Sequence, residues 1–166
     1  MNITAKSIIV DTNIITDLCN SSLIDNFILL DNVYISDMVL NDEINSYTGN
    51  VETISKIRTL ELSNDQLIEV YQINEIYKTL SIYDCVNYVL ARDNNGILAT
   101  GDKRLLNLAK NNNVETIRTL KIIEEMYINN YINKKQMING LELLKNNERT
   151  RIPIRDIDQL IDKYIN

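Results

Sequence analysis

Ser7-Ile8-Ile9-Val10-Asp11-Thr12-Asn13 is the stretch that decides the fold of this chain, because a β-branched apolar run ends in an acid and two polar residues. Such runs, bounded by polar turn-forming residues, are typical of strands buried in a parallel sheet. A second run, at residues 97–100, is followed by Gly101 and Asp102. Doubly wound α/β sheets present their functional residues at the carboxyl ends of their strands. Both stretches therefore predict an acid at one edge of such a sheet.

The rest of the chain alternates strand-like and helix-like segments, which indicates an α/β fold with a parallel sheet. We expect strands at residues 7–11, 33–36, 57–62, 97–100 and 114–117. We expect helices at 13–30, 37–47, 52–56, 63–80, 81–93 and 102–110, and in most of the chain beyond 117. The 63–80 helix is opened by a capping box at Ser63-Asn64-Asp65-Gln66. With one proline and four glycines in 166 residues, no flexible linker divides the chain, and we expect a single domain over residues 1–166.

The chain contains no histidine. This composition excludes Ser-His and Cys-His nucleophiles, histidine acid–base nucleases and histidine-ligated metal centres. The two cysteines, Cys19 and Cys85, are too few and too far apart for a zinc site or a disulfide framework, and we expect both to fill apolar positions. If the protein is an enzyme, its chemistry rests on carboxylates and a metal.

The formal net charge of −6 argues against a general nucleic-acid coat, although net charge does not decide what a local cleft can hold. No stretch approaches the roughly 18–20 apolar residues of a membrane span, and the first residues do not have the layout of a signal peptide. We therefore expect a cytoplasmic protein without a membrane segment.

Four acids stand where strand or helix boundaries would bring them together: Asp11, Glu43, Asp84 and Asp102. Each also has a simpler explanation. Asp11, Asp84 and Asp102 could each merely cap a helix. Glu43 shares a helix face with Val39 and Leu40, but it could also lie on a solvated face, and Asp42 is its rival as the second acid.

Clustered carboxylates repel one another, at a cost of roughly 4 kcal/mol for a pair about 4 Å apart at an effective dielectric constant near 20. A proton or a divalent cation relieves that repulsion. An oxygen-only set of ligands favours Mg²⁺ or Mn²⁺. Lys103 and Arg104, next to Asp102, could meet phosphate oxygens, or they could simply lie on a solvated helix face.

These stretches together resemble the PIN-domain ribonucleases, especially the bacterial VapC-like toxin branch. The resemblance covers roughly residues 7–130 and rests on the order of the acids. It is carried by the stretches 8–13, 35–43, 80–84 and 98–105, which contain Asp11, Glu43, Asp84 and Asp102 in turn.

The resemblance implies a three-layer fold with a central parallel sheet in the order 3-2-1-4-5, a core over about 1–130 and a helical C-terminal extension over about 131–166. It implies Mg²⁺- or Mn²⁺-dependent cleavage of RNA by the quartet Asp11, Glu43, Asp84 and Asp102. Asn13 and Thr100 would be supporting polar residues behind these ligands. It also implies a toxin held inactive by a cognate antitoxin, and a homodimer.

Other functions stay open beside the toxin. A housekeeping RNA-processing nuclease would use the same acids, and a catalytically inactive PIN-like binding module would use them only as caps and surface residues. A HAD-like phosphatase is disfavoured, because it requires an acid where Asn13 stands.

The sequence also leaves the role of the C-terminal segment undecided. Its apolar stripe, from Ile154 to Tyr164, could pack on the chain's own core, or it could bind a second copy or an antitoxin. Arg149, Arg151 and Arg155 flank Pro153, and we expect an extended connector there.

Overall fold

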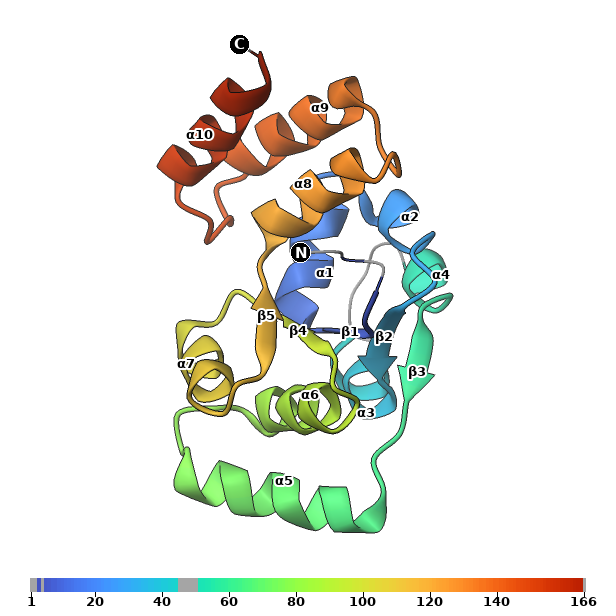
Figure 1. The fold of residues 1–166 in the computed structure, drawn as a ribbon, viewed down its shortest axis with the longest axis vertical. Helices are drawn as coiled ribbons and strands as arrows, with labels where there is room; N and C mark the ends of the chain where they lie inside the picture. The colour runs from blue at the N-terminus through green and yellow to red at the C-terminus, as the bar shows by residue number, and fades with distance from the viewer. Residues whose placement is uncertain (1–2, 4, 45–50, 166) are drawn as a thin grey trace.

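The structure is a computed structural model that describes residue 3, residues 5–44 and residues 51–165. A five-stranded, all-parallel sheet has the strand order β3-β2-β1-β4-β5. Helices cover both faces of this sheet (Figure 1). The predicted α/β class and the strand order 3-2-1-4-5 are thereby confirmed.

The strands are short, and the two central ones are fully buried. Their bounds are β1 Ile8–Val10, β2 Val33–Ser36, β3 Arg58–Leu60, β4 Ile97–Ala99 and β5 Glu115–Ile117. Val10 pairs with Ala99, so β1 and β4 end at the same level. The residues that follow these two strands therefore start side by side at the carboxyl edge of the sheet.

The core has two halves, one on each face of the sheet, because side chains alternate along a strand. Ile8 and Val10 belong to one cluster of buried residues, whereas Ile9 between them belongs to the other. Burying one such side chain stabilises the fold by about 1.5–3 kcal/mol. The sheet is thus held by apolar packing on both faces, which leaves its carboxyl edge for polar residues.

The helices divide between these two halves. The cluster around Ile8 and Val10 includes buried residues of α1 Thr12–Asn20, α2 Ile24–Phe27, α4 Val51–Ile54, α8 Thr119–Ile128, α9 Lys134–Lys145 and α10 Ile154–Ile165. The cluster around Ile9 includes buried residues of α5 Asn64–Ile76, α6 Ile82–Asp93 and α7 Lys103–Asn111. The three-layer arrangement of the prediction is present.

The helix predicted over residues 13–30 is instead two helices, α1 and α2. The chain turns between them at Ser22, whose φ of 57° lies in the left-handed region. Leu23, Ile24 and Phe27 are consequently buried in the core, which a straight continuation of α1 would not achieve.

The region after β2 is also less regular than predicted. In place of one helix over 37–47, α3 Asp37–Val39 leads into a π-helix, Leu40–Ile44, and residues 45–47 lie outside the described part of the chain. The capping box of Ser63 and Gln66 is present, but α5 ends at Ile76 rather than near residue 80. Tyr77, at φ −105° and ψ 63°, leaves the helical conformation there.

The C-terminal helices pack on the chain's own core. Ile157 and Ile161 of α10 are buried in the cluster around Ile8 and Val10. The side chains of Lys163 and Tyr164 bind the carboxylate of Glu124 in α8. Within the described ranges, no helix is both long enough and apolar enough to cross a bilayer.

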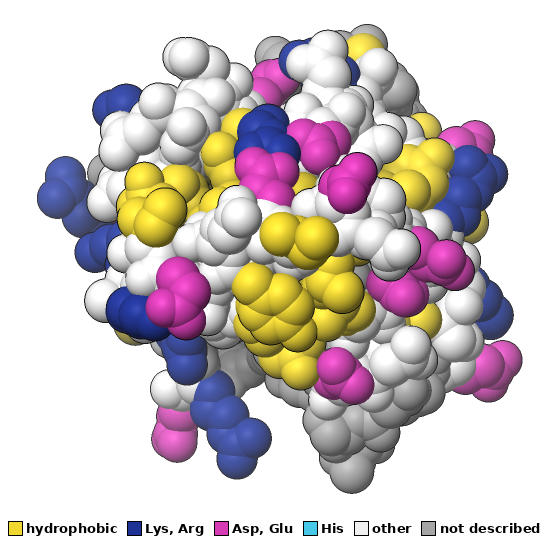
Figure 2. Space-filling model, turned by 90° about the horizontal axis from the view of Figure 1, so that it is seen from below, with side chains coloured by type: hydrophobic (Ala, Val, Ile, Leu, Met, Phe, Trp, Pro, Cys, Tyr) yellow, Lys and Arg dark blue, Asp and Glu magenta, His cyan; other side chains and the backbone are white. Residues whose placement is uncertain are grey.

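On the side of the sheet that carries α6, α5 is the outermost helix (Figure 1). Figure 2 looks at the molecule from that side and shows hydrophobic side chains gathered in the middle of the face, with acids around them. Ile68, Tyr71 and Ile76 of α5 are largely exposed. The middle of this face is therefore apolar.

Candidate active site

The carboxyl edge of the sheet brings two of the predicted acids next to each other. Asp11 follows β1 and Asp102 follows β4, and each is the N-cap of the next helix. The backbone N–H of Asp11 donates to the carbonyl of Ala99 at 3.0 Å, which extends the strand pairing to the acid itself. The structure therefore places this pair where the sequence predicts it.

Asp11 is buried, with 5% of its surface exposed, and its hydrogen-bond donors are neutral groups. The Thr100 hydroxyl donates to Oδ2 at 2.8 Å, and the Asn13 amide donates to the same oxygen at 3.2 Å. Burial raises the pKa of Asp11 above its ordinary value, the bonds from Thr100 and Asn13 oppose this rise, and the charge of Asp84 adds to it. Asp11 is thus a desolvated carboxyl group that has a second acid nearby.

Thr100 connects the two strand ends. It is fully buried, and while its hydroxyl donates to Asp11, its oxygen accepts the backbone N–H of Asp102 at 3.1 Å. One hydroxyl therefore fixes the Asp11 side chain and the start of α7 in a single arrangement. Asn13 and Thr100, the predicted supporting residues, thus both contact Asp11.

Asp84 reaches this edge from α6. Its carboxylate accepts the backbone N–H of Ser81 at 2.8 Å, and its own N–H donates to the Ser81 hydroxyl at 3.0 Å. Asp84 thus caps α6 in a capping box with Ser81, and it also lies close enough to Asp11 to raise the pKa of Asp11. The capping role and the position beside Asp11 are therefore compatible.

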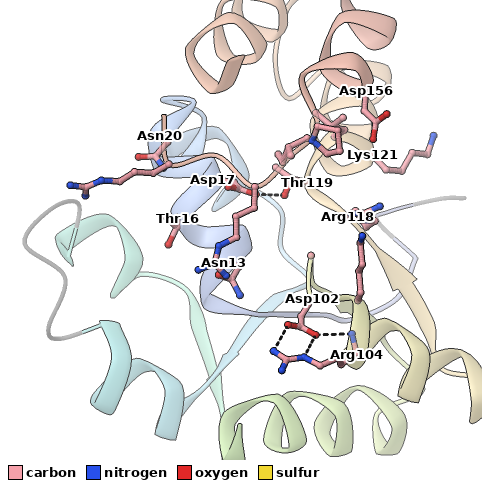
Figure 3. A pocket seen from close by; sticks show the side chains of 17 residues that line it. Asn13, Thr16, Asp17, Asn20, Asp102, Arg104, Arg118, Thr119, Lys121 and Asp156 are labelled. Carbon is pink, nitrogen blue, oxygen red and sulfur yellow. Dashed lines mark hydrogen bonds and ion pairs between the residues drawn. The ribbon is translucent and has the colours of Figure 1, made fainter. Parts of the chain in front are cut away.

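Asp102 has a different environment from Asp11. Its Oδ1 accepts the backbone N–H groups of Arg104 at 2.7 Å and Leu105 at 3.2 Å, and the Arg104 guanidinium pairs with Oδ2 at 3.1 Å. Figure 3 shows Asp102 and Arg104 turned toward each other. Partial burial alone would raise the pKa of Asp102, but the bonds from Arg104 and Leu105 outweigh it and lower the pKa.

The second acid of the predicted quartet is the least well defined in the structure. The backbone of Glu43 belongs to the π-helix, but its side chain lies outside the described part of the structure. Asp42, the rival residue, is exposed and accepts the hydroxyl of Tyr83 at 3.2 Å. This bond places Asp42 near the start of α6, the helix that carries Asp84.

Within the described side chains, no three acids or cysteines lie close enough together to hold a metal ion. Asp11 and Asp84 interact, whereas Asp102 is bound to Arg104. The described part of the quartet is therefore an interacting pair of acids beside a third acid that already has a cationic partner.

One further oxygen near these acids lacks a hydrogen-bond partner. Asn87 is 1% exposed, and its Oδ1 is the one buried side-chain polar atom without a partner among the described residues. It follows Asp84 by three positions on α6, so both lie on the same helix face. An unpaired amide oxygen is costly in a core, and at this place it is a potential oxygen ligand.

A pocket of about 830 Å³ opens beside Asp102, and the sequence analysis did not predict it (Figure 3). It lies between α1, the N-termini of α7 and α8, and the connector that leads to α10. Its acids and bases are Asp17, Asp102, Asp156, Lys103, Arg104, Arg118, Lys121, Arg149 and Arg151. Lys103 and Arg104, the predicted phosphate contacts, thus belong to a larger cationic lining.

Asp17 and Asp156 are the acids of this pocket that the sequence analysis missed, and Asp17 is the half-buried one. The Thr119 hydroxyl donates to it at 2.6 Å. Burial raises the pKa of Asp17, which Thr119 and the charge of Arg151 partly offset. The polar residues Asn13, Thr16, Asp17 and Asn20 recur at helical spacing on α1, opposite Ile14, Ile15 and Leu18, and this pattern could have revealed the polar face.

No family model matches this chain, and comparison with curated proteins and with solved structures likewise finds no significant match.

Proposed function

We propose that this protein is a Mg²⁺- or Mn²⁺-dependent endoribonuclease whose reaction centre lies at the carboxyl edge of the sheet, around Asp11. The observation that carries the proposal is the burial of Asp11 among neutral donors at a strand end, with Asp84 close enough to add to the rise of its pKa. A proton or a cation relieves the cost of such a desolvated carboxylate.

The chemistry of the donors fits a hard divalent cation, because every side-chain donor in question is an oxygen. Asp11 and Asp84 would hold the ion, with Glu43 and Asp102 completing the quartet implied by the PIN-domain resemblance. The unpaired Oδ1 of Asn87 adds an oxygen on the Asp84 face of α6. When bound, such an ion lowers the pKa of a water molecule and neutralises charge on the phosphate that is attacked.

Side chains of the protein would position both the ligands of the ion and the substrate. Thr100 and Asn13 hold Asp11 in one orientation by hydrogen bonds to Oδ2. Arg104 neutralises Asp102, and its side chain is 59% exposed, so the guanidinium can turn to a phosphate oxygen while Asp102 becomes free as a ligand. Lacking histidine, the chain has no imidazole base, so proton transfer falls to water and carboxylates.

Cleavage of a labelled single-stranded RNA by the purified protein with Mn²⁺ tests the proposal. Asp11→Asn should reduce the cleavage rate at least about 100-fold, because it removes a charged ligand of the ion. Asp65→Asn is the matched control, since Asp65 is exposed in the first turn of α5, away from the site. Equal cleavage by the wild type and Asp11→Asn, dependent on Mn²⁺ in both, would remove Asp11 from the mechanism.

A binding module that does not cleave is the second candidate, and the Asp102–Arg104 ion pair is the observation that favours it. Thermal melting with and without Mn²⁺ separates the two functions. A nuclease site should gain stability from Mn²⁺ and lose that gain in Asp11→Asn, whereas a module without an ion site should show no gain in either protein.

We also propose that the biological role is that of a toxin restrained by a cognate antitoxin, with a homodimer as the assembled form. Induced expression in a bacterial host should then arrest growth, and Asp11→Asn should relieve the arrest. A housekeeping processing nuclease predicts instead that induction is tolerated while cleavage in vitro still depends on Asp11.

A further inference from the structure

The pocket beside Asp102 concentrates positive charge in an acidic protein. Six of the chain's 17 lysines and arginines line it, together with three acids, although the whole chain carries a net charge of −6. A concave, positively charged surface raises the local concentration of anions, whatever the net charge of the molecule. The pocket is therefore built for an anionic ligand.

Several of these cations make no ion pair among the described residues, although Arg151 lies near enough to Asp17 to lower its pKa. Arg104 pairs with Asp102, and Lys121 pairs with Glu124 at 2.7 Å and Glu125 at 2.9 Å. The other four make no ion pair within the described part of the chain: Lys103, Arg118, Arg149 and Arg151. Lys103, Arg118 and Arg149 thus bring positive charge without a paired acid in the described ranges to this cavity, and an anion can bind there.

The backbone of the pocket adds to this charge. Arg118 is the N-cap of α8, and its side chain makes no capping hydrogen bond there. The first residues of α8 line the pocket, so the N–H groups at this helix start can donate to a ligand. Phosphate is the anion that suits both arginine side chains and helix N-termini.

The arginines of the far wall come from the connector between α9 and α10. Both Arg149 and Arg151 are exposed, and the connector is held in place because α10 is docked through Ile157 and Ile161. The C-terminal extension thus supplies charge to a cavity whose other end is Asp102, at the strand end that carries the candidate reaction centre.

We propose that this pocket binds the phosphates of a single-stranded RNA next to the bond that is cleaved, with Arg149 and Arg151 as contacts contributed by the C-terminal extension. The inference rests on the proposed nuclease function and names how that site holds its substrate. The cavity, of about 830 Å³, has room for several nucleotide phosphates. None of the described residues that line it is aromatic, so phosphate contacts rather than base stacking carry the binding.

Fluorescence anisotropy of a short labelled oligouridylate, titrated in EDTA at several salt concentrations, tests the proposal without cleavage. The double variant Arg149→Ala/Arg151→Ala should bind roughly tenfold more weakly at low salt. The slope of the logarithm of its binding constant against the logarithm of the salt concentration should become shallower by about 0.7 for each phosphate that the variant no longer neutralises. Arg155→Ala is the matched control, because Arg155 is an exposed arginine of α10 that does not line the pocket.

Lys103→Ala provides a second variant that perturbs folding least, since Lys103 is exposed at the start of α7. It should weaken binding by severalfold. Wild-type affinity in both the double variant and Lys103→Ala would overturn the proposal, as would an equal loss in Arg155→Ala. Capture of an oligoglutamate peptide in place of RNA, abolished in the double variant, would overturn the RNA assignment in favour of an acidic protein partner.

The test separates this proposal from the nuclease itself. Binding in EDTA requires neither a metal ion nor an intact Asp11. If the pocket variants lose RNA while Asp11→Asn leaves cleavage intact, the phosphate site stands and the assignment of the reaction centre falls. If Asp11→Asn abolishes cleavage while the pocket variants bind RNA normally, the reaction centre stands and the phosphate site falls.

Discussion

The junctions β1–α1 and β4–α7 are built alike but treat their acids in opposite ways. In each, a buried three-residue strand is followed by an aspartate that caps the next helix: Asp11 follows β1 directly, and Asp102 follows β4 after Thr100 and Gly101. Asp11 is buried among neutral donors, and its pKa is raised, whereas Asp102 is partly exposed, paired with Arg104, and its pKa is lowered. Two similar junctions thus hold one acid that has only neutral donors among the described residues and one that is paired with a cation.

Removal of the Thr100 hydroxyl, which joins the two junctions, should have the largest effect on stability. Thr100→Val removes this hydroxyl, which serves both Asp11 and the backbone N–H of Asp102, while it keeps the shape of the side chain. Leaving these buried groups unpaired should cost about 1–3 kcal/mol of unfolding free energy. At this chain length each kcal/mol lowers the melting temperature by roughly 2–4 °C.

Thr100→Ser is the control for this change, because it keeps the hydroxyl and loses only a methyl group. Calorimetry should rank the wild type first, Thr100→Ser next and Thr100→Val last. A valine variant as stable as the serine variant would mean that the hydroxyl does not couple the two junctions.

The sequence could predict which residues meet at this edge but not how their charges are compensated. Asp11, Thr100 and Asp102 follow strands that a parallel α/β sheet must align, and Ser81 and Asp84 form a recognisable capping box. The side chain of Arg104 turns back onto Asp102, which depends on a rotamer, and the reversal at Ser22 depends on how α2 fits the core.

The cationic pocket lay beyond sequence reasoning for a related reason. Arg149 and Arg151 reach the edge of the sheet only because α10 packs on α8 and on the core, through interactions between residues far apart in the chain. A pattern along the sequence contains no record of that packing. The polar face of α1 around Asp17 was within reach, since it recurs at helical spacing.

Asp11→Asn should make the protein more stable at neutral pH even as it abolishes cleavage. Because the pKa of Asp11 is higher in the folded state than its ordinary value of 3.8, the folded protein loses stability as pH rises from about 3.8 through the folded pKa. Asparagine carries no charge and escapes this loss. Melting in EDTA should therefore show the variant a few degrees above the wild type at pH 7, with the gap closing toward pH 4.

Saturating Mn²⁺ supplies the complementary measurement for the same pair of proteins. Ion binding should raise the wild type's melting temperature and leave Asp11→Asn unchanged, which narrows or reverses the gap seen in EDTA. A variant that is less stable than the wild type in EDTA at pH 7 would contradict the view that Asp11 is a strained, desolvated acid.

Asp102→Asn should lower the stability at pH 7, the opposite of Asp11→Asn, and its effect should be smaller than those of Thr100→Val and Asp11→Asn. The pKa of Asp102 is lowered in the folded state, so its charge contributes stability above its ordinary pKa of 3.8, and this is lost as pH falls through the folded pKa. Asparagine remains a good N-cap, so the change removes mainly the pairing with Arg104, which is 59% exposed. The expected cost at pH 7 is below about 1 kcal/mol and vanishes in acid. Denaturant unfolding at pH 7 and pH 3 measures it, and a variant more stable than the wild type at pH 7 would show that both junctions hold strained acids after all.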